Sequence, residues 1–229
     1  MRRVVVLAGG SPHAHDFVAS GAALAGLAAG AGYDVCLVDH PDHAAELVAE
    51  NADALAVCGL WWRMHGDAYD VWRDDHAYSP PTRTRDALAR FVRGGGGMLA
   101  VHTAPICFDD WPEWGAIVGG SWQWGTSSHP PYGPVRADVV GDHPVVAGLT
   151  GTIEMSDEVY GDLAVGDDVE VLALAKRDAD DDDQPVMWAH RYGRGRVVFD
   201  GFGHDVDSIV HPQNARVLIQ ALAWITELD

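Results

Sequence analysis

Histidines and carboxylates follow the apolar runs of this sequence at points where a buried strand would release the chain into a loop. His102 ends the run 98–101 in the stretch GGGGMLAVHTAP, and His204 follows the run 196–200. Imidazoles, carboxylates and phenols give or take protons, and the first two also bind divalent metal ions. The residues that we expect to do chemistry are His102, Glu158, Tyr160 and His204.

A metal site is one interpretation of these residue types, and acid–base chemistry without a metal is the other. No pair of candidates has the sequence spacing of a known metal motif. The sequence therefore predicts no particular cofactor, and whether a divalent metal ion is bound stays open. Its candidate ligands are His102, His129, Glu158 and His204.

Tryptophans are concentrated in the same loops, after the apolar runs 54–58 and 98–101. A flat indole with an N–H donor suits the apolar face of a sugar ring as well as it suits a core. A single tryptophan more often packs in a core, but several in neighbouring loops favour a binding site. The residues that we expect to bind a substrate are His15, Trp61, Trp62, His129, Asp157 and Asp205.

The first half of the chain contains the elements that would position these side chains. Short apolar runs alternate with segments of helical periodicity, a pattern typical of a parallel sheet with helices on both faces. Ligands of such sheets bind outside the carboxyl ends of the strands, where the histidines lie. The predicted strands are 4–8, 35–38, 54–58 and 98–101, and the predicted helices are 15–30, 43–50 and 82–93.

The second half has a different texture. It is rich in Gly, Pro, Trp and His from about residue 119, and its apolar runs indicate antiparallel strands, two of which are joined by the tight turn 192–195. The predicted strands are 135–140, 169–175, 185–190 and 196–200, followed by an amphipathic helix at 212–228. The length of 229 residues favours one domain over residues 1–229, an α/β fold with added antiparallel strands.

The formal charge of −19, from 34 Asp and Glu against 15 Lys and Arg, argues against nucleic-acid and membrane partners, because anionic surfaces repel it. Part of this charge lies in the run 178–183, which we interpret as a solvated loop. No apolar run approaches the roughly 18 residues of a membrane span. The apolar start of the chain is interpreted as a first strand rather than a signal peptide, because it ends at Gly9.

Three cysteines form no CxxC pair. Cys36 and Cys58 lie in apolar runs, which is typical of core thiols in a reducing compartment and predicts a cytoplasmic protein. His102 occupies the position that Ser or Cys holds in enzymes with a nucleophile elbow, and Cys107 comes five residues too late. Histidine can act there as an acid, a base or a ligand, so amidotransferase and protease chemistry is not expected.

An ordered series of short motifs runs along nearly the whole chain: GGG at 95–97 with Val101-His102, WPEW at 111–114 with VGG at 118–120, His129-Pro130, DHPV at 142–145 with Gly148-Leu149, DEVY at 157–160, PVMW at 185–188, and YGRGRV at 192–197 with GHD at 203–205. This series resembles the ThuA-like (trehalose-utilisation) family, whose fold is similar to that of class I glutamine amidotransferases without the catalytic cysteine. The resemblance implies a flavodoxin-like sheet and a role in carbohydrate utilisation, often on keto-sugars. The long segment 61–81 departs from the family pattern and leaves the sugar open.

Two functional hypotheses follow. The first is an enzyme that acts on a sugar or keto-sugar as an isomerase, lyase or hydrolase. The alternative is a non-catalytic sugar-binding or regulatory module that kept the fold after losing its nucleophile. Both predict a small carbohydrate as the partner, and both leave open whether the chain forms a homo-oligomer.

Overall fold

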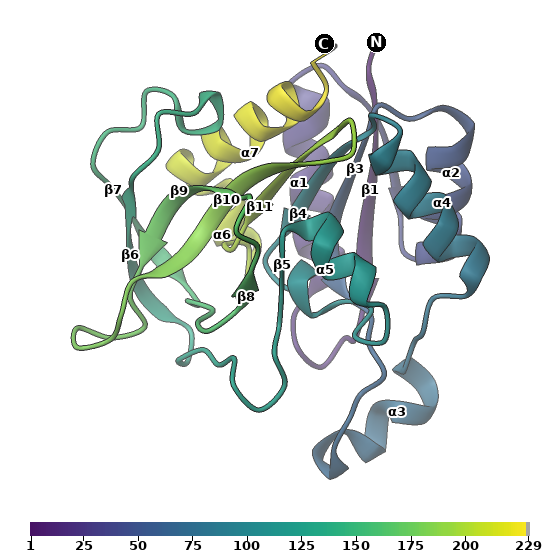
Figure 1. Cartoon of the computed structure of the whole chain (residues 1–229), viewed down its shortest axis with the longest axis horizontal. Coiled ribbons are helices and arrows are strands. Elements are labelled where there is room, and N and C mark those ends of the chain that lie inside the picture. Colours follow the sequence, from purple (N-terminus) through teal and green to yellow (C-terminus); the bar gives the residue numbers. More distant parts are fainter. Residues whose placement is uncertain (228–229) are drawn as a thin grey trace.

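The computed structural model describes residues 1–227, and a nine-stranded mixed sheet runs through it in the order β2-β1-β3-β4-β11-β10-β9-β6-β7 (Figure 1). Strands β5 and β8 pair separately. The strands are β1 (Arg3–Gly10), β2 (Asp34–Val38), β3 (Ala54–Leu60), β4 (Gly97–Val101), β5 (Gly120–Ser121), β6 (Gly133–Val139), β7 (Thr152–Asp157), β8 (Ala164–Val165), β9 (Glu170–Ala175), β10 (Gln184–Tyr192) and β11 (Gly195–Asp200).

The first four sheet strands are parallel, as the apolar runs predict, and β11 extends the parallel part by pairing with β4. The central strands β3 and β4 are buried along their whole length, because helices cover both of their faces. Cys58 lies in this core, but Cys36, also predicted as a core thiol, is only partly buried, because β2 is an edge strand.

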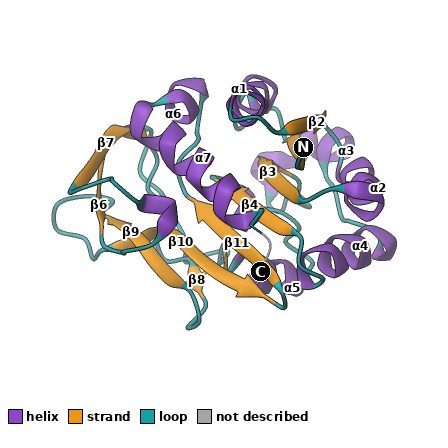
Figure 2. Ribbon diagram, turned by 90° about the horizontal axis from the view of Figure 1, so that it is seen from above, coloured by secondary structure: helices purple, strands orange, loops and turns teal. Residues whose placement is uncertain are grey.

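Helices pack on both faces of the parallel strands (Figure 2). One face carries α1 (Phe17–Gly30), α6 (Val206–Val210) and α7 (Pro212–Ile225), and the other carries α2 (Pro41–Asn51), α4 (Thr82–Arg93) and α5 (Pro112–Val118). Helix α3 (Asp70–His76) projects from the body (Figure 1). The predicted fold class, α/β with helices on both faces and antiparallel additions, is confirmed.

The structure differs from the sequence prediction at several elements. Segment 196–200 is antiparallel only to β10, across the two-residue turn 193–194, and is parallel to β4. Strand β7 and the short helices α3 and α5 were not predicted. The two helices have seven residues each, which is too short for a clear helical periodicity. The last helix ends at Ile225, and residue 228 of its predicted span lies outside the described residues.

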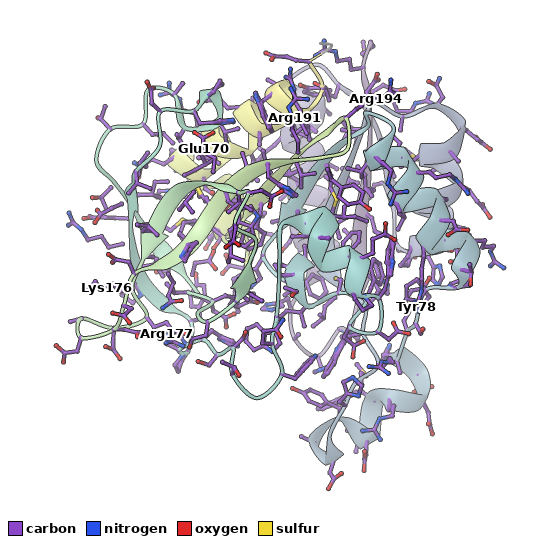
Figure 3. All side chains as sticks on the ribbon, in the orientation of Figure 1. Tyr78, Glu170, Lys176, Arg177, Arg191 and Arg194 are labelled. Atoms are coloured by element: carbon purple, nitrogen blue, oxygen red, sulfur yellow. The ribbon has the colours of Figure 1, made fainter. Side chains whose placement is uncertain are left out.

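The acidic run 178–183 forms the loop between β9 and β10, as expected for a solvated segment. Arg177 lies at the start of this loop (Figure 3), and it pairs with Asp162 and Asp181. Across residues 1–227, no helix is both long and apolar enough to cross a membrane.

Candidate active site

Four loops that follow the carboxyl ends of strands bring their side chains to one region. His15 follows β1, Glu158 follows β7 and His204 follows β11, and these three line a pocket; His102, after β4, does not line it. The pocket has a volume of about 300 Å³. Its described lining is His13, Ala14, His15, Leu60, Trp62, Tyr69, Thr103, Ile106, Trp122, Trp124, His129, Glu158, Tyr160 and His204.

His102 lies beneath this pocket on a sharp turn. Its backbone φ is +50°, a left-handed conformation that costs a non-glycine residue about 1–2 kcal/mol. The hydrogen bond from its N–H to the Asp200 carbonyl, 2.8 Å long, stabilises this turn. The backbone at Gly203 passes close to the end of β4. A Cβ atom on residue 203 would lie 2.7 Å from Val101 Cγ1, so only glycine fits there without a shift. The elbow predicted at His102 is therefore present.

The ring of His102 is 1% exposed and has fixed partners. Its Nδ1 lies 2.9 Å from the Gly201 carbonyl oxygen, so Nδ1 carries a proton and donates it. Its Nε2 lies 3.1 Å from the Tyr160 hydroxyl. Burial opposes protonation of His102, but the carboxylates of Glu158 and Asp157 outweigh it and raise the pKa. The titrating atom is therefore Nε2, at the floor of the pocket.

Glu158 is the anion at the centre of the imidazoles. Its Oε2 lies 3.5 Å from His102 Nε2, and its Oε1 lies 3.5 Å from His204 Nδ1 and 3.4 Å from His129 Nδ1. Burial alone would raise the pKa of Glu158, but the imidazoles of His102 and His204 lower it well below the usual range. The carboxylate is therefore ionised at neutral pH.

His15 and Tyr160 are held in their neutral forms. Burial, assisted by the imidazole of His102, lowers the pKa of His15 to about 3. The His15 ring centroid lies 4.9 Å from that of His102 and 4.4 Å from that of His204. Burial, assisted by the charge of Glu158, raises the pKa of Tyr160 well above its usual value. Tyr160 therefore keeps its proton and can donate it in a hydrogen bond.

Asp157 supports the site from behind rather than lining the pocket. Its carboxylate accepts hydrogen bonds from the backbone N–H groups of Glu158 (2.7 Å), Gly203 (2.9 Å) and His204 (3.4 Å). The residue is 1% exposed. It therefore joins the end of β7 to the loop after β11 and fixes the positions of Glu158 and His204 relative to each other.

Indole rings form one wall of the pocket. Trp62 stacks on Trp124 with ring centroids 4.6 Å apart and an interplanar angle of 12°. Trp122 lies edge-on to Tyr160, with centroids 5.5 Å apart. Trp124 is 46% exposed, so part of its surface is free to contact a ligand.

Besides Asp157, two more residues that were predicted to bind substrate do not line the pocket. Trp61 is 4% exposed and packs in the core against Gly9 and Gly59. Asp205 caps helix α6 by accepting a hydrogen bond from the Ser208 N–H at 2.8 Å. Neither lines the pocket. His13, Tyr69, Thr103 and Ile106 line it without having been predicted, because polarity or aromaticity alone does not single them out.

The donor atoms that could hold a metal ion belong to a set slightly different from the predicted one. One ligand atom from each of His15, His102, Glu158 and His204 lies within 4.8 Å of the others. His129 is outside this group, and its Nδ1 donates to the Pro130 carbonyl at 2.9 Å. His15 thus takes the place predicted for His129.

Cys107 is unsuited to nucleophilic chemistry. Its thiol is buried against the Gly59 carbonyl, 3.0 Å away, and burial raises its pKa to about 12. A thiol of this kind stays protonated and unreactive at neutral pH.

The sheet order and the sharp turn at His102 define an α/β protein with a glutamine amidotransferase-like fold. A profile of the ThuA family, described as trehalose utilisation, matches residues 3–225. The chain belongs to the ThuA family.

Solved structures agree with this fold. A putative ThuA-like protein from Parabacteroides merdae superposes with a TM-score of 0.77 at 18% identity, over 98% of this chain and 90% of that one. One from Bacteroides uniformis gives 0.72 at 18% identity, over 98% and 91%. A β-galactosidase from Rahnella sp. R3 gives 0.65 at 13% identity, over 97% of this chain and 31% of that one. No curated protein sequence matches the chain significantly.

Proposed function

We propose that this protein is a carbohydrate-utilisation enzyme that transfers a proton next to the carbonyl group of a sugar or keto-sugar. The observation that carries the proposal is the convergence of an ionised Glu158, several imidazoles and the Tyr160 hydroxyl at one tryptophan-walled pocket. The family description, trehalose utilisation, supports a carbohydrate as substrate.

The pocket suits a small polar ring. Its volume of about 300 Å³ is at the lower end of the roughly 300–1,000 Å³ of small-molecule sites. The indoles of Trp122 and Trp124 offer flat faces to the C–H surface of a sugar, and the imidazoles offer partners for its hydroxyl groups.

His129 is the group that we infer to remove the proton. Its Nδ1–H is held by the Pro130 carbonyl and lies 3.4 Å from Glu158 Oε1, which leaves the lone pair of Nε2 free. A carboxylate beside Nδ1 stabilises the imidazolium that forms when Nε2 takes a proton. His129 is also partly exposed, its side chain at 38%, and so can exchange that proton with solvent.

Tyr160 and His102 form the electrophilic end of the site. As the substrate C–H bond breaks, its proton passes to His129 and its electron pair forms the C=C bond of an enediol. The carbonyl oxygen then takes the proton of the Tyr160 hydroxyl, and His102 Nε2, 3.1 Å away, returns a proton to Tyr160. Return of the first proton to the neighbouring carbon completes an isomerisation, and loss of a β-substituent completes an elimination.

The carboxylate inventory favours this chemistry over retaining glycoside hydrolysis. Among the described residues that line the pocket, Glu158 alone has a carboxyl group. A retaining glycosidase needs two carboxyl groups, about 5–5.5 Å apart, on opposite sides of the bond that breaks.

The experiment incubates the protein with mono- and disaccharides and their oxidised keto forms in D₂O, and follows products and deuterium incorporation by mass spectrometry. We expect deuterium at the carbon next to the carbonyl. We expect the signal to fall at least about 100-fold in H129Q and E158Q, and to persist in H43A, which changes an exposed histidine on α2. Thermal stabilisation by a sugar without any exchange or product would refute the enzyme and favour the sugar-binding module.

A further inference from the structure

The donor atoms of His15, His102, Glu158 and His204 converge at the pocket floor from four separate strand ends. We propose that these four side chains bind one divalent transition-metal ion, for which Zn²⁺ is the probe. The role of the ion in turnover rests on the proposed function, whereas its binding does not.

Orphaned polar atoms are the first argument. His15 Nδ1, Glu158 Oε2 and His204 Nδ1 are all buried without a hydrogen-bond partner. Buried polar atoms in folded proteins nearly always have one. The Glu158 side chain is 8% exposed, so its unpartnered oxygen would be costly to bury unless a ligand compensated it.

Spacing is the second argument. Glu158 Oε2 and His102 Nε2 are 3.5 Å apart, as are Glu158 Oε1 and His204 Nδ1. Both distances exceed the roughly 2.7–3.2 Å of a good hydrogen bond. Ligands placed about 2.1 Å from a tetrahedral ion are about 3.4 Å from one another. These two pairs of atoms are therefore spaced as ligands of a common ion rather than as hydrogen-bonded partners of each other, and one donor atom from each of the four side chains lies within 4.8 Å of the others.

The groups behind the ligands supply the third argument. The Gly201 carbonyl fixes the proton of His102 on Nδ1 and leaves Nε2 as the donor atom, and the Asp157 carboxylate holds the backbone of His204 and Glu158. Carbonyl and carboxylate partners of this kind orient metal-binding imidazoles in other proteins.

The donor set also selects the class of ion. Three imidazoles and one carboxylate suit Zn²⁺, Co²⁺, Ni²⁺ or Fe²⁺, whereas Mg²⁺ and Ca²⁺ prefer oxygen. His15, Glu158 and His204 all line the pocket, so a substrate oxygen could reach the ion there. With the ion bound, His102 Nε2 carries no proton for Tyr160, so in the proposed reaction the ion would take over the electrophilic role of His102 and polarise the carbonyl oxygen that Tyr160 faces.

The experiment uses chelator-treated protein without a histidine tag, titrated with Zn²⁺ by calorimetry and checked by elemental analysis after gel filtration. We expect one Zn²⁺ per chain, no comparable heat from Mg²⁺, and a higher melting temperature in the presence of Zn²⁺. Affinity should fall at least about 10-fold in H204A and E158Q. It should stay within about 3-fold of the wild type in H129A, which removes a pocket imidazole outside the ligand set, and in H43A.

Circular dichroism shows whether each variant is folded. H15N changes a ligand that is only partly buried, so it is a milder substitution if the buried variants do not fold. Absence of stoichiometric Zn²⁺ binding by the folded wild type would overturn the proposal, as would equal affinity in folded H204A and H129A. Zn²⁺ binding without deuterium exchange would overturn only the proposed function. Exchange that survives complete metal removal would overturn only the role of the ion in turnover.

Discussion

Asp157→Asn isolates the contribution of the buried carboxylate that joins β7 to the loop after β11. In the wild type, one oxygen accepts the Glu158 N–H and the other accepts the N–H groups of Gly203 and His204. Asparagine keeps the shape but has one acceptor oxygen and an NH₂ group that donates. In its better orientation it keeps the two bonds to 203–204 and turns its NH₂ group toward the N–H of Glu158.

The loss of one backbone hydrogen bond to the carboxylate sets the size of the expected destabilisation. A hydrogen bond to a charged group contributes about 1.5–3 kcal/mol, and an unsatisfied buried donor adds its own desolvation cost. Since Asp157 is 1% exposed, water cannot compensate the loss. We expect the free energy of unfolding to fall by about 2–4 kcal/mol, which for a chain of this size lowers the melting temperature by about 4–16 °C.

Urea denaturation and thermal melting measure this loss, with D205N as the matched control. Asp205 lies one residue beyond His204 but caps helix α6, and asparagine is about as good an N-cap as aspartate. D205N should therefore cost less than about 0.5 kcal/mol. A loss below about 1 kcal/mol in D157N, or one equal to that of D205N, would show that Asp157 does not hold the site together.

Two further predictions concern other parts of the molecule. Partial burial opposes ionisation of Asp42, but hydrogen bonds from Thr84 and Tyr78 (Figure 3) outweigh it and lower its pKa. Its stabilising contribution is present above the unfolded pKa of about 3.9 and is lost as the pH falls through the lower folded value. D42N should therefore be about 1–2 kcal/mol less stable than the wild type at pH 7, and urea denaturation at pH 3–7 should show the gap narrowing toward pH 3. W124A should weaken sugar binding about 3- to 10-fold and lower stability by under about 1 kcal/mol, because Trp124 is 46% exposed; unchanged affinity by calorimetry would remove the indole from the binding surface.

The arrangement of strand ends is the part of the site that the sequence predicts well. Parallel strands deliver their carboxyl ends to one edge, so His15 and His102, which follow two predicted parallel strands, could be expected together. Glu158 and His204 could not be placed by this rule, because β7 was not predicted and 196–200 was predicted as an antiparallel strand. The predicted site roles themselves stay predictions until the variants above are made. The parallel sheet was equally predictable, because its runs are buried on both faces and bounded by glycine-rich loops.

The choice between neighbouring side chains was not predictable in the same way. Trp61 and Trp62 are adjacent, and consecutive residues of an extended segment point to opposite sides. Only the packed structure shows that Gly9 and Gly59 make room for Trp61 and leave Trp62 for the pocket. The capping role of Asp205 did have a sequence signal, an aspartate directly before a short helical segment. No sequence signal shows that His15, rather than His129, belongs to the candidate metal ligands, because this depends on how loops distant in the sequence pack together.

The insertion of β11 between β4 and β10 has a consequence for synthesis of the protein. Strand β4 pairs with β11 on one side, so this edge of β4 stays open during synthesis until β11 has left the ribosome. The backbone N–H and the ring Nδ1–H of His102 donate to the carbonyls of Asp200 and Gly201, and Gly201 is translated 99 residues after His102. A chain cut before β11 therefore lacks both acceptors that hold His102 in place.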